Sequence, residues 1–160
     1  MRTYHRSYWM LLLPLLLCVS CEDIKEAFGD DDDKFEARDL KFFGQWQGTQ
    51  SGVELPAQRV IKNQQDWTAL WQQIHSGQSG SPDAPRIDFE KRMVLAALMG
   101  RQSTGGHSIQ ITRVREREND VRARYRQISP TGSGAPGQTS PYHLVEVRRV
   151  KGKPVEWVAE

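Results

Sequence analysis

The sequence predicts an α+β fold in which one amphipathic helix packs on a mostly antiparallel, sandwich-like β-sheet. The segment 67–74 repeats apolar residues at i, i+3, i+4 and i+7, which is the pattern of a helix with one buried face. The segment 93–99 is apolar throughout, as in a strand covered on both faces. The β-like segments that follow are joined by connections too short for parallel crossovers, so we expect antiparallel pairing.

The first elements are two short strands and the helix. Residues 42–49 are aromatic and punctuated by glycine, which predicts an edge strand or a packed turn, and residues 57–62 predict a short strand. Asn63 is a suitable N-cap for the helix, and Gly77 is expected to end it. Two tryptophans on one helical face can form a platform for stacking sugars, but at this spacing they are more typical of a hydrophobic core.

The remaining elements are strands. Residues 108–114 alternate through Ile109 and Ile111, and residues 121–126 place apolar side chains on one face and arginines on the other. Residues 142–150 and 154–159 flank a Lys-Gly-Lys sequence at 151–153. This arrangement predicts a hairpin in which Gly152 takes a positive φ.

The first 20 residues predict a signal peptide. Arg2, His5 and Arg6 precede an apolar stretch over 9–19, which at about 1.5 Å per residue is too short to cross a bilayer as a helix. The small residues before Cys21 resemble those of bacterial lipoprotein signals, in which the cysteine receives lipid chains such as palmitate and becomes the new N-terminus. Cys18 stands where a leucine is usual. A plain secretory cut after Ser20 also fits the sequence, so both processing routes stay open.

We expect three parts in the chain: the lipoprotein signal peptide over 1–20, an acidic flexible tether over 21–40 and a globular domain over 41–160. The tether carries the run Asp30–Asp33, and like charges at this density keep a chain extended. A calcium loop fits this run less well, because the spaced ligands and the glycine turn are missing. Without the signal peptide, Cys21 is the one remaining cysteine, which excludes an internal disulfide and a cysteine-based metal site.

Charge is distributed unevenly along the chain. Without residues 1–20 there are 20 basic and 20 acidic residues, so the processed chain is neutral. Residues 22–90 carry 7 Lys and Arg against 14 Asp and Glu, whereas residues 91–160 carry 13 against 6. The first half is therefore acidic and the second half basic.

Two loops, 100–106 and 129–141, are richer in glycine and proline than a hairpin needs, which indicates shaped surfaces. Around them the sequence resembles the C-terminal domain of the protease complex subunit PrcB over roughly residues 58–150. A tyrosine is common in that family where this chain has His107. The segments that carry the resemblance are Trp67-x-x-Leu70-Trp71, Ile87–Lys91, Met93–Ala96, Gly100-Arg101-x-x-Thr104-Gly105-Gly106-x-Ser108-Ile109 and Thr139-Ser140-Pro141-Tyr142-x-Leu144-Val145.

The resemblance implies an exported, often lipid-anchored accessory protein associated with a surface protease, and it brings no established catalytic residues. Our hypothesis is therefore a lipid-anchored, non-catalytic interaction protein of the bacterial cell envelope. It binds, and in one form of the hypothesis stabilises, an exported or cell-surface protease. Cys21 attaches it to the membrane, and Glu22, where some inner-membrane lipoproteins have aspartate, favours the outer membrane. The expected partner-binding residues are Arg101, Ser103, Thr104, Gly105, Gly106, His107, Pro130, Gly132, Pro141 and Tyr142.

The alternative hypothesis is a protease inhibitor that acts through clustered Gly/Pro loops. The segments 103–106, 130–136 and 141–142 are similar in loop chemistry, not in sequence, to the three clustered loops of the chagasin-like inhibitors of cysteine peptidases. This hypothesis requires Thr104, Gly132 and Tyr142 to lie at one end of the sheet.

We expect no enzymatic activity and no cofactor. The sequence contains no HExxH motif, no Gly-x-Ser-x-Gly elbow and no phosphate-binding loop. His107 and His143 lack a visible third ligand for zinc. Ser103 and Ser108, although close to His107 in the sequence, are typical loop serines.

Six arginines predict a basic face once a hairpin closes around residues 119–120. Acidic residues interrupt the set, so a solvated hairpin with ion pairs is the favoured interpretation. The functional alternatives are docking on an acidic partner, on anionic lipid headgroups or on the chain's own Asp30–Asp33 run. Nucleic acid is not an expected partner of an exported protein. The six are Arg113, Arg115, Arg117, Arg122, Arg124 and Arg126.

Overall fold

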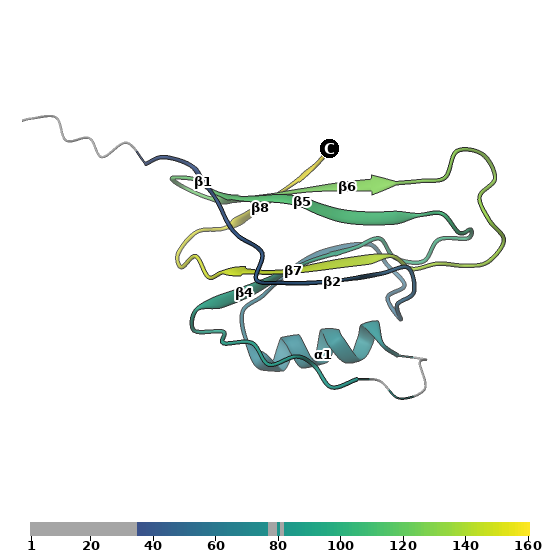
Figure 1. The fold of residues 1–160 in the computed structure, drawn as a ribbon, viewed down its shortest axis with the longest axis horizontal. Helices are drawn as coiled ribbons and strands as arrows, with labels where there is room; N and C mark the ends of the chain where they lie inside the picture. The colour runs from purple at the N-terminus through teal and green to yellow at the C-terminus, as the bar shows by residue number, and fades with distance from the viewer. Residues whose placement is uncertain (1–34, 77–79, 81) are drawn as a thin grey trace, which may run out of the picture. The chain divides into compact units, whose positions relative to one another are not determined.

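Two four-stranded sheets and one helix form three layers in the computed structural model, which describes residues 35–76, 80 and 82–160 (Figure 1). Sheet A has the strand order β1-β5-β6-β8 and sheet B the order β2-β7-β4-β3. The described part is thus mainly β with a small helix, and its sheets are mostly antiparallel. The elements are β1 (Arg38–Asp39), β2 (Gly44–Gly48), β3 (Ala57–Ile61), α1 (Gln64–Ile74), β4 (Arg92–Leu98), β5 (Ser108–Glu116), β6 (Val121–Ile128), β7 (Tyr142–Arg148) and β8 (Val155–Ala159).

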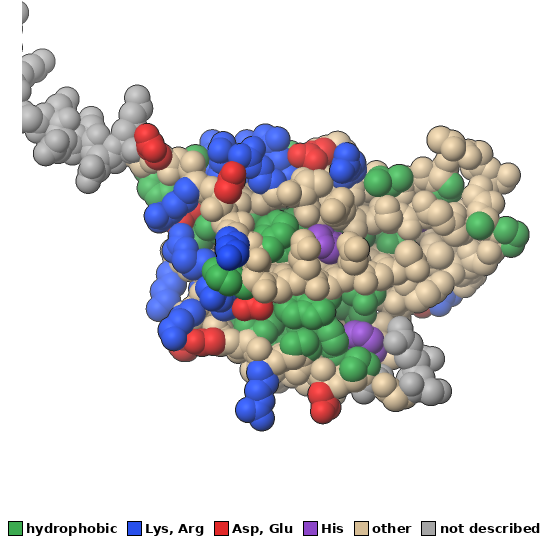
Figure 2. All heavy atoms as spheres, viewed as in Figure 1, with side chains coloured by type: hydrophobic (Ala, Val, Ile, Leu, Met, Phe, Trp, Pro, Cys, Tyr) green, Lys and Arg blue, Asp and Glu red, His purple; other side chains and the backbone are tan. Residues whose placement is uncertain are grey.

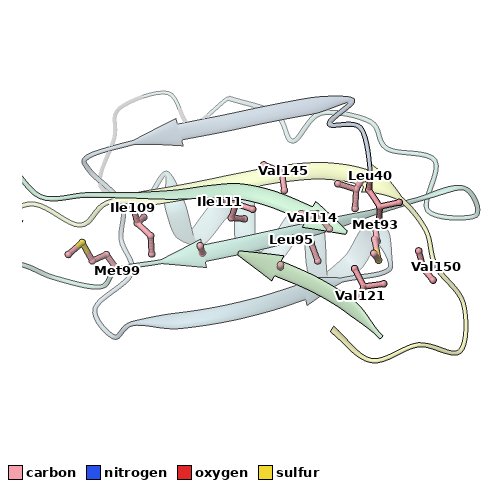
Figure 3. Packing of buried hydrophobic residues seen from close by; sticks show 13 residues of the cluster. Leu40, Met93, Leu95, Met99, Ile109, Ile111, Val114, Val121, Val145 and Val150 are labelled. Carbon is pink, nitrogen blue, oxygen red and sulfur yellow. The ribbon is translucent and has the colours of Figure 1, made fainter. Parts of the chain in front are cut away.

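Strand β4 is covered on both faces, as its uninterrupted apolar sequence predicted. Met93, Leu95 and Ala97 belong to a core cluster between the sheets, to which β5, β6 and β7 also contribute (Figure 3). The alternate side chains of β4, including Val94 and Leu98, belong to a second cluster under α1. Because successive side chains of a strand point to opposite faces, one apolar strand serves both cores.

Helix α1 begins at the predicted cap, where Asn63 Oδ1 accepts a hydrogen bond of 2.8 Å from the Asp66 N–H. It ends at Ile74 with His75 as the C-cap, and the predicted end at Gly77 lies outside the described residues. Trp67 is fully buried and Trp71 nearly so, with ring centroids 5.2 Å apart. The tryptophans therefore belong to the core and do not form an exposed sugar platform.

The predicted hairpin between β7 and β8 is wrong. Strand β7 lies in sheet B, while β8 lies in sheet A and runs parallel to β6. Gly152 does take a positive φ of 74°, but the link that contains it crosses between the sheets. This crossing lets Val155 and Trp157 pack against the core between the sheets, where Trp157 meets Tyr125 edge-on at 6.1 Å. Strand β7 is already paired on both sides, with β2 and β4, whereas β6 has a free side for β8.

The described chain is already ordered before residue 41, inside the segment expected to be a tether. Arg38 and Asp39 pair with Glu116 and Arg115 of β5, and Leu40 is buried in the core between the sheets. The signal peptide 1–20, the anchor Cys21 and the run Asp30–Asp33 lie outside the described residues. Within residues 35–76, 80 and 82–160, no helix combines the length and apolar character that a membrane span requires.

Candidate functional site: the loop end and the adjoining groove

Three loops, 49–56, 99–107 and 129–141, lie at one end of the two sheets, and we call them together the loop end. The strand registers bring them there. Tyr142 at the start of β7 pairs with both Gly48 at the end of β2 and Leu98 at the end of β4. Thr104, Gly132 and Tyr142 therefore lie at the same end of the two sheets, as the inhibitor hypothesis requires.

Loops 99–107 and 129–141 are fastened to each other by backbone hydrogen bonds. Gln102 and Thr139 exchange two of them, of 2.7 and 3.1 Å, and the Gly105 N–H donates to the Ala135 carbonyl at 2.8 Å. The Thr139 hydroxyl adds a bond of 2.9 Å to the Thr104 carbonyl. Each loop therefore limits the conformations of the other, and the pair forms a defined surface.

Loop 49–56 is tied to the same surface through Ser140, a buried residue. Its hydroxyl donates to the Val53 carbonyl at 2.5 Å and also lies 2.8 Å from the Ser51 hydroxyl. The Arg101 N–H donates to the Glu54 carbonyl at 2.9 Å, and the two side chains form an ion pair. All three loops are thus held by hydrogen bonds between them.

Glycine is required where these loops touch. Gly106 has a φ of +89°, and a Cβ there would lie 3.1 Å from Pro130 Cβ. Gly134 has a φ of +70°, and a Cβ there would lie 2.9 Å from both the Gly105 carbonyl oxygen and Thr104 Oγ1. Larger residues would strain the backbone and push the loops apart.

The ten predicted partner-binding residues fall into two groups. Arg101, Ser103, Gly106 and Gly132 are exposed and can meet a partner directly. The others are at least partly buried and shape the surface, as when the buried Pro141 accepts the Met99 N–H at 2.9 Å. This second group comprises Thr104, Gly105, His107, Pro130, Pro141 and Tyr142.

The loop end is nearly uncharged. Figure 2 shows few Lys, Arg, Asp or Glu side chains there, whereas Lys and Arg gather over sheet A and at the opposite end of the domain. Charged side chains are depleted in the centres of protein interfaces because their desolvation is costly. The composition of the loop end is therefore suited to contact with another protein.

His107 leaves one buried nitrogen without a partner. Its Nε2 lies 3.0 Å from Thr104 Oγ1, whereas Nδ1 is buried and makes no hydrogen bond within the described part of the chain. An unsatisfied buried donor or acceptor costs about 1–3 kcal/mol. His107 is thus held by its own loop through one nitrogen, with the other free to bond a water or partner group that reaches it.

His143 serves the fold, because its Nδ1 accepts the Ile111 N–H at 2.8 Å and joins β7 of sheet B to β5 of sheet A. Burial lowers the pKa of His143, which keeps the ring neutral as this acceptor role demands. The described hydrogen-bond partners of His107 and His143 are therefore Thr104 and Ile111, not Ser103 or Ser108. Among the described residues, no three His, Cys, Asp or Glu side chains are grouped as metal ligands.

A groove of about 470 Å³ adjoins the loop end and was not predicted from the sequence. One wall is the end of β2 around Gly48, the other is the start of β5 from Ser108 to Gln110, and Tyr142 also lines it. Burial raises the pKa of the Tyr142 hydroxyl, so this residue presents a neutral phenol. The groove depends on which strands border each sheet, and the sequence of β2 or β5 alone does not reveal this.

The predicted basic face is present on the outer side of sheet A, where five arginines and Ala37 line a hollow of about 240 Å³. Each of the five has a carboxylate partner. Asp39 pairs with Arg113 at 2.6 Å and with Arg115 at 3.2 Å, and the hydrogen bond from Arg113 contributes most to lowering the pKa of Asp39. Glu156 pairs with Arg122 at 2.8 Å, and longer ion pairs of 3.6 and 3.7 Å join Arg117 to Asp120 and Arg124 to Glu160. The solvated, ion-paired hairpin is therefore the interpretation that these contacts favour.

A comparison with models of protein families found a match in the same part of the chain. Searches of curated proteins and of solved structures gave no match. Residues 93–148, which run from β4 to β7 and include loops 99–107 and 129–141, match the family model described as PrcB C-terminal. The predicted resemblance to the PrcB C-terminal domain family is thereby confirmed for residues 93–148.

Proposed function

We propose that this protein is a non-catalytic accessory protein, lipid-anchored through Cys21 in the bacterial cell envelope, and that it binds and stabilises a protease through the loop end. The observation that carries the proposal is that the matched segment 93–148 contains two loops fastened to each other. A surface ordered before binding loses less conformational entropy when a partner docks. Its near-neutral composition further supports a protein partner.

The first experiment recovers the lipidated full-length protein from its own cells in detergent and identifies the proteins that accompany it. The test variant carries Ser103→Arg and Thr131→Arg, two exposed positions on loops 99–107 and 129–141. The matched control is Gln72→Arg, which places the same side chain on the exposed side of α1. We expect the double variant to recover at least tenfold less protease than wild type, and the control to recover an equal amount.

Two outcomes would refute this proposal: the absence of any stoichiometric protease, or equal recovery by the double variant and wild type. Equal melting temperatures of the three proteins are the necessary check that the added arginines leave the fold intact.

Inhibition is the second candidate, and the clustering of the three loops at one end favours it. The assay compares the activity of the recovered protease with and without the accessory protein. A protease that is longer-lived and equally active in the complex supports stabilisation. A protease that regains activity when the loop-end variant releases it supports inhibition.

A further inference from the structure

Strand β5 has an unpaired edge. Its pairing with β1 is limited to Glu116 and Arg115, and the Leu40 N–H adds a bond of 2.8 Å to the Val114 carbonyl. In the described part of the chain, β1 is the one strand on that side of β5. On the side of β1, residues 108–113 thus have no neighbouring strand in the described part of the chain, and we call this stretch the open edge.

Two separate hollows adjoin the open edge. The groove next to the loop end reaches Ser108, Ile109 and Gln110, and a second hollow of about 270 Å³ includes Thr112 and Arg113. Sheet B provides the opposite wall of the groove at Gly48 of β2. The larger hollow adjoins residues 108–110, and the smaller one, which β1 also lines through Asp39, adjoins residues 112–113.

The protein already places its own chain on the same side of β5. Strand β1 occupies the far end, with Asp39 on the outer face and Leu40 turned into the core between the sheets. Asp39 is held there by Arg113 and Arg115. A strand that continued this path would likewise place alternate side chains on the outer face and between the sheets.

These features define the chemistry of the occupant. Side chains turned inward would lie beside Ile109 and Ile111, which are buried, and beside the ring of Tyr142. Side chains turned outward would lie on the face that carries the exposed Arg126 and Arg113, of which Arg113 is already paired with Asp39. The groove thus suits an extended segment that alternates apolar residues with acidic or polar ones.

We propose that the partner protein contributes one such extended segment, which adds a strand to sheet A by pairing with residues 108–113 of β5 through backbone groups other than the Ile111 N–H, which His143 Nδ1 already accepts. This proposal rests on the proposed function, because it names the contact through which the same partner is held. Strand addition supplies affinity through backbone hydrogen bonds and specificity through alternate side chains. The β-bulge between Ile111 and Arg113 lies near the β1 end of this edge, so regular pairing is expected chiefly along residues 108–110.

The test places a photoreactive benzophenone amino acid at Gln110, in the full-length protein, in the cells that produce it. A second variant carries it at Ser108, two residues away on the same strand, and the control carries it at Gln72, an exposed glutamine of α1. Mass spectrometry identifies the residues captured after illumination. The readout is both the yield and the position of each crosslink.

We expect at least tenfold more crosslinking from Gln110 than from Gln72, directed to one short segment of one partner. The Ser108 variant should capture the same segment two residues along, because paired strands advance in step. Crosslinks scattered over the partner surface, crosslinks to a second copy of this chain, or a Gln110 yield equal to that of Gln72 would each overturn the proposal.

The loop-end experiment separates this proposal from the proposed function. If Ser103→Arg with Thr131→Arg abolishes recovery of the protease while Gln110 captures nothing, the accessory function stands and strand addition is refuted. If neither experiment finds a partner, both fail. A melting temperature within about 2 °C of wild type is required of each photoreactive variant, as the check that its fold is intact.

Discussion

Single side chains set how this domain responds to pH, and His143 is the clearest case. It is 1% exposed, its pKa is lowered by burial, and its Nδ1 must stay unprotonated to accept the Ile111 N–H. At pH values just below the ordinary histidine pKa of 6.5, the unfolded chain therefore binds a proton at this histidine, whereas the folded chain does not. The stabilising contribution is complete above that pH and is lost as the pH falls toward the lowered value.

We predict that the free energy of unfolding of wild type decreases between pH 7.5 and pH 5.5. Each unit by which the pKa of His143 is lowered accounts for about 1.4 kcal/mol of this loss once the pH is below both values. His143→Gln keeps an acceptor without a titrating ring and should flatten the profile. Urea unfolding at several pH values measures both effects. A wild-type profile that is already flat would contradict the assignment.

Gly106 gives a second residue-scale prediction. With a φ of +89° and Pro130 close to the Cβ position, Gly106→Val is expected to lower the free energy of unfolding by about 1–3 kcal/mol. Ser103→Ala, on the same loop but exposed, should change it by less than about 0.5 kcal/mol. Thermal unfolding of the two variants provides the comparison. Equal melting temperatures would mean that the loop relaxes around the valine.

At the scale of elements, Glu116 of β5 connects segments that do not all pair with β5 as strands. Its buried carboxylate meets Arg38 of β1 at 3.0 Å and Lys153 of the β7–β8 link at 3.2 Å, and it also pairs with Arg148 of β7. Burial by itself would raise the pKa of Glu116, but the hydrogen bonds from Arg38 and Lys153 and the charge of Arg148 outweigh it and lower the pKa. One carboxylate thus connects both sheets.

Glu116→Gln should therefore lower the free energy of unfolding by about 1–3 kcal/mol at pH 7. Because the folded pKa lies below the ordinary value of 4.5, the contribution is present above that pH and disappears as the pH falls through the lowered value. Wild type and variant should accordingly converge in stability under acid conditions. Glu118→Gln, an exposed neighbour, is the control and should match wild type. A difference that persists at low pH would indicate lost packing and not lost charge.

An element could be predicted from the sequence where its own residue pattern specifies it. Its position in the fold could not be predicted where that depends on which strand it pairs with. The helical spacing of Trp67 and Trp71 and the apolar run of β4 need no knowledge of neighbours, so both elements were predicted. The alternation of Val155 and Trp157 indicates a strand, but it fits a strand paired with β7 as well as one paired with β6. The groove arises because β1 pairs with only two residues of the longer β5, which no local pattern of β5 records. The loop residues were predicted from composition, whereas their division into exposed and supporting groups required the contacts.

For the whole molecule, the proposed anchor is the feature that decides where the loop end acts. We predict that Cys21→Ser leaves the domain folded and moves the protein from the membrane fraction to the soluble fraction, because the acceptor of the lipid is removed. Fractionation of cells producing each form, followed by immunoblotting, measures the distribution. Equal partitioning of the two proteins would favour the plain secretory cut after Ser20 over lipidation.

The order of strands in sheet A also has a kinetic consequence. Its two borders are formed by the first and last strands of the described chain, and the Arg38–Glu116 contact closes a loop between residues 78 positions apart. Closing such a long loop costs conformational entropy before the distant contacts form. We therefore expect refolding in milliseconds to seconds, as in other domains in which most strand pairs are distant in sequence. During that interval the side of β5 that later pairs with β1 is exposed. The same edge proposed to hold a partner is then also the surface by which incompletely folded chains would aggregate.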